Sequence, residues 1–431
     1  MPETFPTTLA ISHTWDWVIF AAVYAGIAIG TIPFTRLNRS AIALLGAIAV
    51  VAIGRLSFTD AVGHVDFATL ALLFALMVIA AMLRVAGFYT RIIEWIVSRA
   101  HKPWTLLVGV IAAAAILSAI FANDIICLAF APVLCVGLQK AGRRPLPYLI
   151  ALATSSNIGS AATIIGNPQN MLIGQSAHLS FGHYCLIAAP LVLACLILNV
   201  LVVAIVYRKT LFTAAEIAVV GPQHAELVVP DFPFRPWQVA KTLLIMLGLM
   251  LAFLFTGVPR EISALVAAGL VLISRTQDPR KLFALVDWEL ILLFIGLFVV
   301  IGNVQQQGLM QQALDHITAQ GVQIYQPVPF SLITVALSNI VSNVPAVLLL
   351  KHGLAVPAGT ADPVTYTWYL LAVVSTFAGN FTLLGSIANL IVAEQSKPHG
   401  VKMGFVEYLK AGVPLTILTT VLAVVYFGWL V

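Results

Sequence analysis

The chain has 431 residues, of which 61% are hydrophobic and only 9% are charged, and its formal net charge is +5. A soluble domain carries about 25% charged residues, so this composition excludes a globular protein with a water-facing shell. Because helices satisfy their own backbone hydrogen bonds in lipid, the long apolar runs predict an all-α polytopic membrane protein. We expect membrane lipid around it and no nucleic-acid partner. The four cysteines lie in apolar segments without metal-ligand spacing, so neither a metal site nor a cofactor is expected.

Apolar segments give the predicted elements in chain order. Transmembrane spans are predicted near residues 15–33, 41–54, 66–83, 183–207, 238–256, 261–274, 286–304 and 411–430. Gly, Pro and Asn interrupt the stretches 104–173 and 327–393, and each stretch is interpreted as a re-entrant helical hairpin followed by a broken helix. The expected total is about 10 transmembrane helices, two hairpins and two broken helices. Residues 86–100 and 308–320 are less apolar, which is typical of interfacial helices.

The chain repeats itself over half its length. Residues 163–170 read TIIGNPQN, and residues 382–389, which lie 219 positions later, read TLLGSIAN. Nearly the same offset pairs 41–54 with 261–274, and Asn123 with Asn343. The sequence therefore predicts two homologous halves, 15–207 and 238–430, joined by a polar cytoplasmic linker at 208–237.

Basic residues predict the orientation, because cytoplasmic loops retain Lys and Arg. If both termini lie outside, most basic segments face the cytoplasm. They are Arg36 with Arg39, Arg84 to Lys102, Lys140 to Arg144, Arg208 to Arg235, Arg275 to Lys281 and Lys397 to Lys410. Arg55, Arg260 and Lys351 then face outward. The first hairpin must open to the cytoplasm and the second to the outside. The halves are thus predicted to be inverted-topology repeats, an architecture typical of secondary transporters.

Polar residues gather at the hairpin tips and in the broken helices. Interrupted helices expose backbone amides and carbonyls, which membranes tolerate where those groups line a wet cavity or bind a ligand. Each half should therefore contribute one tip and one broken helix to a shared midplane site. The predicted substrate-binding residues are Asn123, Asn157, Thr163, Gly166, Asn167, Ser342, Asn343, Asn380, Thr382, Gly385 and Ser386. The alternative for each of them is a role in close helix packing.

Asp124 is the one ionisable residue among these segments, and its counterpart in the second half is Val344. An ionisable residue inside the membrane is costly and usually functional. We interpret Asp124 as the coupling carboxylate that binds H+ or Na+, with a helix cap at the hairpin tip as the alternative. Asp66 and Asp287 stand at span starts and are interpreted as caps. Cys127 is interpreted as a buried inert thiol, with contact to a soft ligand as the alternative.

The phrases FAND at 121–124, SNVP at 342–345 and IGNPQN at 165–170 carry a family resemblance. Over nearly its whole length the chain resembles the ion transporter superfamily, which holds the arsenite permeases of the ArsB type, sodium/proton antiporters of the NhaD type and sodium symporters for divalent anions. The resemblance implies a scaffold region, a mobile transport region and alternating access by an elevator-like motion, often in a homodimer. It also implies that some members dock a separate soluble ATPase, for which the linker 208–237 is a conceivable surface.

The leading functional prediction is a secondary permease of the bacterial inner membrane that exports arsenite or antimonite in exchange for protons. As(OH)3 is largely uncharged near neutral pH, and neither the tips nor the broken helices contain Arg or Lys. The alternatives are a sodium-coupled symporter for a dicarboxylate or inorganic oxyanion, and a sodium/proton antiporter. The chain contains no phosphate-binding G-x-x-x-x-G-K-[ST] loop, so ATP hydrolysis is not expected in it. An intramembrane enzyme is not expected either, because the predicted spans contain no paired Asp, no Ser/His arrangement and no H-E-x-x-H motif.

Overall fold

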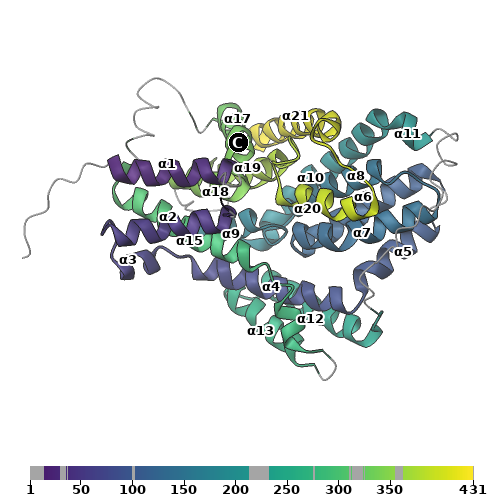
Figure 1. Cartoon of the computed structure of the whole chain (residues 1–431), viewed down its shortest axis with the longest axis horizontal. Helices are drawn as coiled ribbons and strands as arrows, with labels where there is room; N and C mark the ends of the chain where they lie inside the picture. Colours follow the sequence, from purple (N-terminus) through teal and green to yellow (C-terminus); the bar gives the residue numbers. More distant parts are fainter. Residues whose placement is uncertain are drawn as a thin grey trace, which may run out of the picture. The chain divides into compact units, whose positions relative to one another are not determined.

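The computed structural model is all-helical in the part of the chain that it describes, residues 14–29, 35, 37–99, 102–212, 233–274, 277–309, 312, 324, 326–354 and 363–430. The chain divides into two compact units, residues 1–67 with 288–323 and residues 68–287 with 324–431. Each unit takes segments from both sequence halves. The units are described separately below (Figure 1).

The first unit contains α1 (Thr14–Ile29), α2 (Arg39–Ala52), α3 (Phe58–Gly63) and α15 (Trp288–Gln306). Helix α15 packs closely along α2, and α1 packs on both. A side chain at Gly296 of α15 would approach the backbone carbon of Ala43 in α2 to 2.5 Å, so the close packing of these helices requires glycine there.

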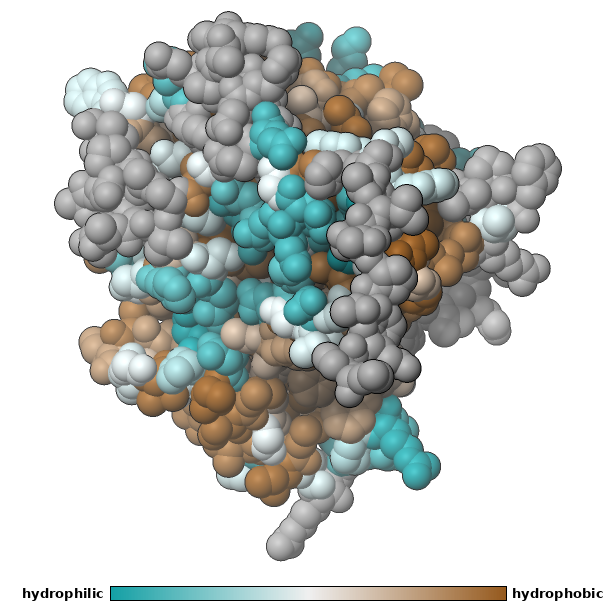
Figure 2. All heavy atoms as spheres, turned by 90° about the vertical axis from the view of Figure 1, so that its left-hand side faces the viewer, coloured by the Kyte–Doolittle hydropathy of each residue, from teal (hydrophilic) through white to brown (hydrophobic). Residues whose placement is uncertain are grey.

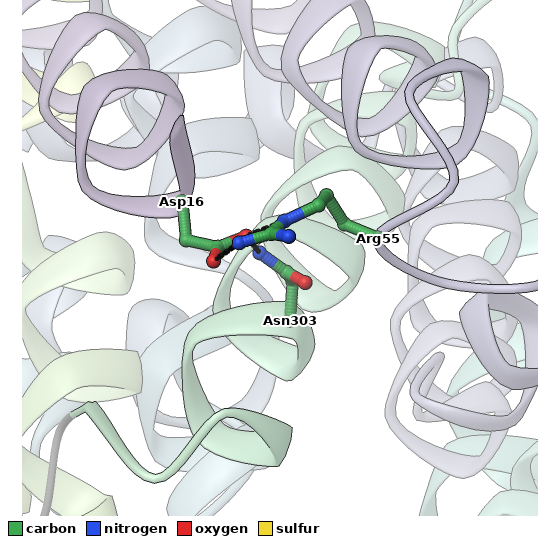
Figure 3. A network of polar contacts seen from close by, with 3 residues as sticks. All are labelled: Asp16, Arg55 and Asn303. Carbon is green, nitrogen blue, oxygen red and sulfur yellow. Dashed lines mark hydrogen bonds and ion pairs between the residues drawn. The ribbon is translucent and has the colours of Figure 1, made fainter. Parts of the chain in front are cut away.

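A buried ion pair joins three segments of the first unit (Figure 3). Arg55, just after α2, donates from Nε to Oδ1 of Asp16 at 2.7 Å, and its second nitrogen contacts the other carboxylate oxygen. Asn303 of α15 donates to the same Oδ1 at 2.9 Å. Because Asp16 lies near the start of α1 while Arg55 and Asn303 follow or end their helices, α1 runs antiparallel to α2 and α15.

The second unit begins with α4 (Phe67–Val85) and α5 (Phe88–Arg99) and then holds the two interrupted regions. In the first half these are α6 (Pro103–Ile120), α7 (Asn123–Lys140), α8 (Leu146–Ser160), α9 (Pro168–Ser176) and α10 (Phe181–Val206). In the second half they are α17 (Pro327–Val341), α18 (Asn343–Leu350), α19 (Pro363–Ala378), α20 (Ile387–Ser396) and α21 (Phe405–Leu430). The duplication seen in the sequence is therefore present in the structure, where each half contains one hairpin and one broken helix.

Six further elements complete the described part of the second unit. They are α11 (Arg208–Phe212), α12 (Pro236–Phe255), α13 (Arg260–Leu272), α14 (Pro279–Phe283) and the 3-10 turns η2 (Lys351–Gly353) and η3 (Lys397–His399). Of the predicted linker 208–237, residues 213–232 lie outside the described residues, as does most of the predicted interfacial helix 308–320. Asp66 and Asp287 each immediately precede a long helix, α4 and α15, as expected of caps.

The eight predicted spans are confirmed as helices, with ends that shift by a few residues. Seven helices among the described residues are long and apolar enough to cross a membrane, namely α4, α6, α7, α10, α12, α15 and α21, and four shorter helices are also apolar. Hydrophobic residues cover wide areas of one face of the molecule (Figure 2). Helix α12, for example, exposes Leu244, Leu247 and Phe255. Such surfaces suit contact with lipid and not with water.

Candidate functional site

The first hairpin tip lies against the break between α8 and α9. At the tip, the Asn123 N–H donates to the Gly166 carbonyl at 3.1 Å, and Ser156 of α8 donates to the Asn123 carbonyl at 3.2 Å. Thr163, in the break, donates to the carbonyl of Ala119 in α6 at 2.5 Å. The tip between α6 and α7 therefore lies beside the break between α8 and α9. This arrangement fits a hairpin that enters the membrane and turns back.

The second hairpin tip repeats this arrangement against the break between α19 and α20. In the orientation that satisfies its neighbours, the Asn343 amide nitrogen donates to the carbonyls of Ser375 at 3.1 Å and Gly385 at 3.3 Å. Thr382 in the break donates to Oδ1 of Asn339 in α17 at 3.0 Å. Gly166 and Gly385 thus receive hydrogen bonds from the asparagines of their respective tips.

Both breaks are closed by the same internal hydrogen bond. Asn170 of α9 donates from Nδ2 to the Thr163 carbonyl at 3.1 Å, and Asn389 of α20 donates to the Thr382 carbonyl, also at 3.1 Å. The helices that follow are capped alike, since Asn167 accepts from the Asn170 N–H at 2.9 Å. In α20, Ser386 accepts from the Ala388 N–H at 3.2 Å. Local sequence therefore dictates where each broken helix resumes.

Other atoms closely approach the glycines of the two breaks. A side chain at Gly166 would lie 2.2 Å from the Ser160 carbonyl oxygen, and one at Gly385 would lie 2.6 Å from Oδ1 of Asn339. Both distances are too short for any Cβ atom. Glycine is therefore required at position 166, where backbone atoms of Ser160 are in the way, whereas at position 385 the nearest atom is the end of the Asn339 side chain.

Asn157 of α8 joins the two halves into one polar network. Its Nδ2 donates to Oδ1 of Asn380 at 2.8 Å and to Oδ1 of Asn389 at 3.0 Å. Its Oδ1 accepts from Asn123 at 3.0 Å and from Ser386 at 3.0 Å. All five side chains are buried. A hairpin tip and both broken helices therefore meet around a single amide.

The comparisons with known proteins show the family of the chain. A family model described as Citrate transporter (CitMHS) matches residues 24–378. The chain belongs to this citrate transporter family. It is 29% identical to a silicon efflux transporter from Oryza sativa subsp. japonica, with 99% of this chain and 98% of that protein covered. It is 25% identical to the putative transporter arsB from Dictyostelium discoideum, with 90% and 87% covered.

A solved structure shares the fold. The crystal structure of the Alcanivorax borkumensis YdaH transporter, described as having an unusual topology, matches with a TM-score of 0.55 and 15% sequence identity, covering 96% of this chain and 97% of that one. Together with the family match, this makes the chain a multi-pass membrane protein and a secondary transporter of the ion transporter superfamily, and not an enzyme.

The predicted site residues of this CitMHS member fall into connected groups. The structure links Asn123, Asn157, Asn380 and Ser386 directly, and it brings Gly166 to the first tip and Gly385 to the second. Thr163 and Thr382 tie the breaks to the hairpins, and Asn343 lies at the second tip. Asn167 caps α9 and donates to Thr376 and to Ser160, which in turn donates to the Asn157 carbonyl. Ser342 occupies the turn before α18 with a positive φ of 76°, an uncommon conformation for a residue with a side chain.

Sequence reasoning missed four residues of this network. They are Asn170, Asn389, Asn339 and Thr376. Asn170 and Asn389 close the duplicated phrases TIIGNPQN and TLLGSIAN, so the repeat itself marked them. Thr376 lies 219 positions after Asn157, the same offset that relates the two phrases. Applying that offset to every polar residue of the first half would have found it.

Two buried polar atoms in this region have no hydrogen-bond partner among the described residues, Oδ1 of Asn123 and Oγ of Ser338. Asn123 lies at the tip of the first hairpin, and Ser338 lies in the second hairpin, near the end of α17. A buried acceptor without a partner is costly, and a transporter site is a place where a ligand or water supplies one.

Asp124 follows Asn123 in the first turn of α7. It is half-buried and makes no hydrogen bond or ion pair to the residues that the structure describes. The Asp287 carboxylate, just before α15, adds negative potential at Asp124. Negative potential favours the binding of a proton or another cation by a carboxylate. Cys127, one turn further along α7, is fully buried.

Proposed function

We propose that this transporter exports small uncharged metalloid hydroxides, arsenite and antimonite first, in exchange for protons. The supporting observation is the chemistry of the two tips and two breaks. Residues 118–124, 154–170, 338–345 and 375–389 contain Asn, Gln, Ser, Thr and backbone groups, no Arg or Lys, and one carboxylate, that of Asp124. Such neutral donors and acceptors match the hydroxyl groups of As(OH)3, which carries no charge that a basic residue would have to balance.

The named relatives support the same ligand class. One is named as a silicon efflux transporter and another as an arsB-like transporter. Dissolved silicon at neutral pH is the uncharged hydroxide Si(OH)4, so both names point to small neutral polyhydroxy solutes. We propose Asn123, Asn157, Thr163, Gly166, Asn167, Ser342, Asn343, Asn380, Thr382, Gly385 and Ser386 as the residues that form the substrate site.

Asp124 is the proposed proton carrier. It is the one charged side chain in the tips and breaks, and the Asp287 carboxylate adds negative potential there. A proton bound by Asp124 on one side of the membrane and released on the other would couple export to the proton gradient. A sodium/proton antiporter is the third candidate, and it would be expected to carry more buried carboxylates than Asp124 alone.

A sodium-coupled symporter for citrate or another carboxylate is the second candidate. The family description favours it. So does the position of the first turns of α7, α9, α18 and α20 at the tips and breaks, because helix N-termini attract anions without any basic side chain. In this reading Na+ lies near Asn123, Asn157 and the Gly166 carbonyl. Its oxygen ligands would include the unpartnered Oδ1 of Asn123.

The family resemblance supports four further proposals. We propose an elevator-like alternating access, a homodimer, a position in the bacterial inner membrane with both termini outside, and inversion of the halves 15–207 and 238–430. A soluble ATPase partner would dock on the linker 208–237. Cysteine labelling of Arg208 and Arg275 positions from each side of intact and inverted vesicles tests the orientation, which is refuted if both positions label from the outside.

The deciding experiment uses everted membrane vesicles that contain the protein. Arsenite accumulation is measured with an imposed proton gradient and then with a sodium gradient, in the wild type, Asp124→Asn, Asn123→Ala and Asn343→Ala. The control is Asp278→Asn, which alters the carboxylate that caps α14. Proton-driven accumulation that Asp124→Asn abolishes supports the proposal. Absence of arsenite movement under both gradients refutes it, and sodium-driven citrate uptake would then establish the second candidate.

A further inference from the structure

Thr376 of α19 belongs to the second half of the chain, yet its hydroxyl lies on the α9 cap of the first half. Its Oγ1 accepts hydrogen bonds from Nδ2 of Asn167 at 3.2 Å and from Nε2 of Gln169 at 3.3 Å. Its own proton goes to the Ala372 carbonyl at 2.8 Å, one turn back in the same helix. Thr376 is 1% exposed, so water does not compete for these bonds.

The opposite contact exists on the other side. Asn157 belongs to α8 of the first half, and it binds Ser386 and Asn389 around the cap of α20 in the second half. Asn157 and Thr376 are 219 positions apart, as are Asn167 and Ser386. Each broken helix is therefore held at its cap by the intact segment that precedes the break in the other half.

We propose that Thr376 and Asn157 are a reciprocal pair of positioning residues that fasten the two half-sites into one polar unit. Thr376 acts through Asn167 and does not itself contact the solute. Its role is to fix the first turn of α9, so that both caps face the solute in a single geometry. This inference rests on the proposed site, and it is independent of which solute is carried.

Removing the Thr376 hydroxyl has a defined consequence. Thr376→Val keeps the side-chain shape but removes the acceptor of Gln169 Nε2 and one of the two acceptors of Asn167 Nδ2, which still donates to Ser160 Oγ at 2.8 Å. Both amide residues are buried. A buried donor without a partner disturbs its surroundings more than the loss of one hydrogen bond suggests. Thr376→Ser retains Oγ and should retain the contact. The expected pattern is therefore loss in the valine variant and rescue in the serine variant.

The test compares Thr376→Val, Thr376→Ser and a matched control, Thr334→Val, in proteoliposomes. Thr334 of α17 is also buried, but among the described residues its hydroxyl bonds only to the Phe330 carbonyl of its own helix, at 2.7 Å. We expect Thr376→Val to raise the KM for the transported solute by about tenfold or more. Thr376→Ser and Thr334→Val should stay within about threefold of the wild type. An unchanged KM in Thr376→Val overturns the inference.

Backbone hydrogen exchange gives a second readout that needs no transport. The N–H groups of Asn170 and Met171 bond to Asn167 at 2.9 and 3.1 Å. Faster exchange in a peptide spanning these residues is expected in Thr376→Val and not in Thr334→Val. If the wild type moves no offered solute, the proposed function fails while this exchange still decides the positioning role. Should Thr376→Val not fold, Thr376→Cys replaces it, because sulfur is a weak acceptor of similar size.

Discussion

Breaking the buried ion pair of the first unit should be the most damaging single change outside the transport site. Arg55→Met removes the guanidinium and keeps an unbranched side chain. The Asp16 carboxylate then loses its guanidinium partner, although its side chain has 0% exposure and that of Arg55 only 10%. Removing one partner of a buried pair costs about 3–5 kcal/mol. The folding equilibrium should therefore shift by a factor of roughly 10² to 5 × 10³.

The double variant separates the free energy contributed by the ion pair from the cost of removing only one of its two charges. Asp16→Leu with Arg55→Met removes both charges, and such replacements are often neutral or stabilising. The double variant should thus be more stable than Arg55→Met alone. As a control, Lys397→Met breaks a pair with Glu394 in which the side chains are 59% and 62% exposed. That exposed pair should contribute about 0–1 kcal/mol.

The assay is denaturant unfolding in detergent micelles, followed by tryptophan fluorescence, with Trp17 next to the pair in α1. Arg55→Met should lower the transition midpoint clearly, and Lys397→Met should leave it nearly unchanged. A loss of less than about 1 kcal/mol in Arg55→Met, the value of an exposed pair, would refute the argument. Equal instability of the single and double variants would refute it as well.

Three further changes have defined outcomes. Gly166→Ala should abolish transport and destabilise by about 3 kcal/mol or more, because the added carbon lies 2.2 Å from the Ser160 carbonyl oxygen; uptake and thermal unfolding measure both effects. Ser342→Gly should stabilise the fold by roughly 1 kcal/mol, because glycine adopts the φ of 76° without strain; denaturant unfolding measures this. Arg260→Gln should cost about 1–3 kcal/mol, because Arg260 Nη2 donates to the Gly174 carbonyl at the end of α9 at 2.7 Å; hydrogen exchange in α9 measures it.

Each of these changes has an outcome that contradicts its reasoning. Gly248→Ala is the control for the first, because no atom lies within 4 Å of the added carbon, and equal effects at both glycines would refute the steric argument. Destabilisation by Ser342→Gly would show that its side chain contributes more than its backbone costs. Unchanged exchange in Arg260→Gln would show that α9 does not depend on that guanidinium.

Hydropathy and the duplicated phrases were sufficient to locate the helices, the two hairpins and the two broken helices. These features depend on local chemistry, because apolar runs, caps and helix breakers act within a few residues. Gly166, Asn167, Asn380 and Gly385 were predicted for the same reason. Thr376 and Asn339 were not, since their roles come from contacts with other elements and not from their own neighbours in the chain.

The sequence by itself determined an all-helical, duplicated membrane protein with its polar residues at tips and breaks. It left Arg55, Arg260 and Lys351 as exceptions to the orientation pattern. Only the tertiary structure showed that each is held by hydrogen bonds, to Asp16, to the Gly174 and Leu179 carbonyls, and to Ser176 respectively. The partners of Arg260 and Lys351 lie 81 or more residues away, and Asn157 reaches 232 residues to Asn389. Hydropathy shows which segments are excluded from water, whereas the pairing between distant polar groups depends on how the helices pack.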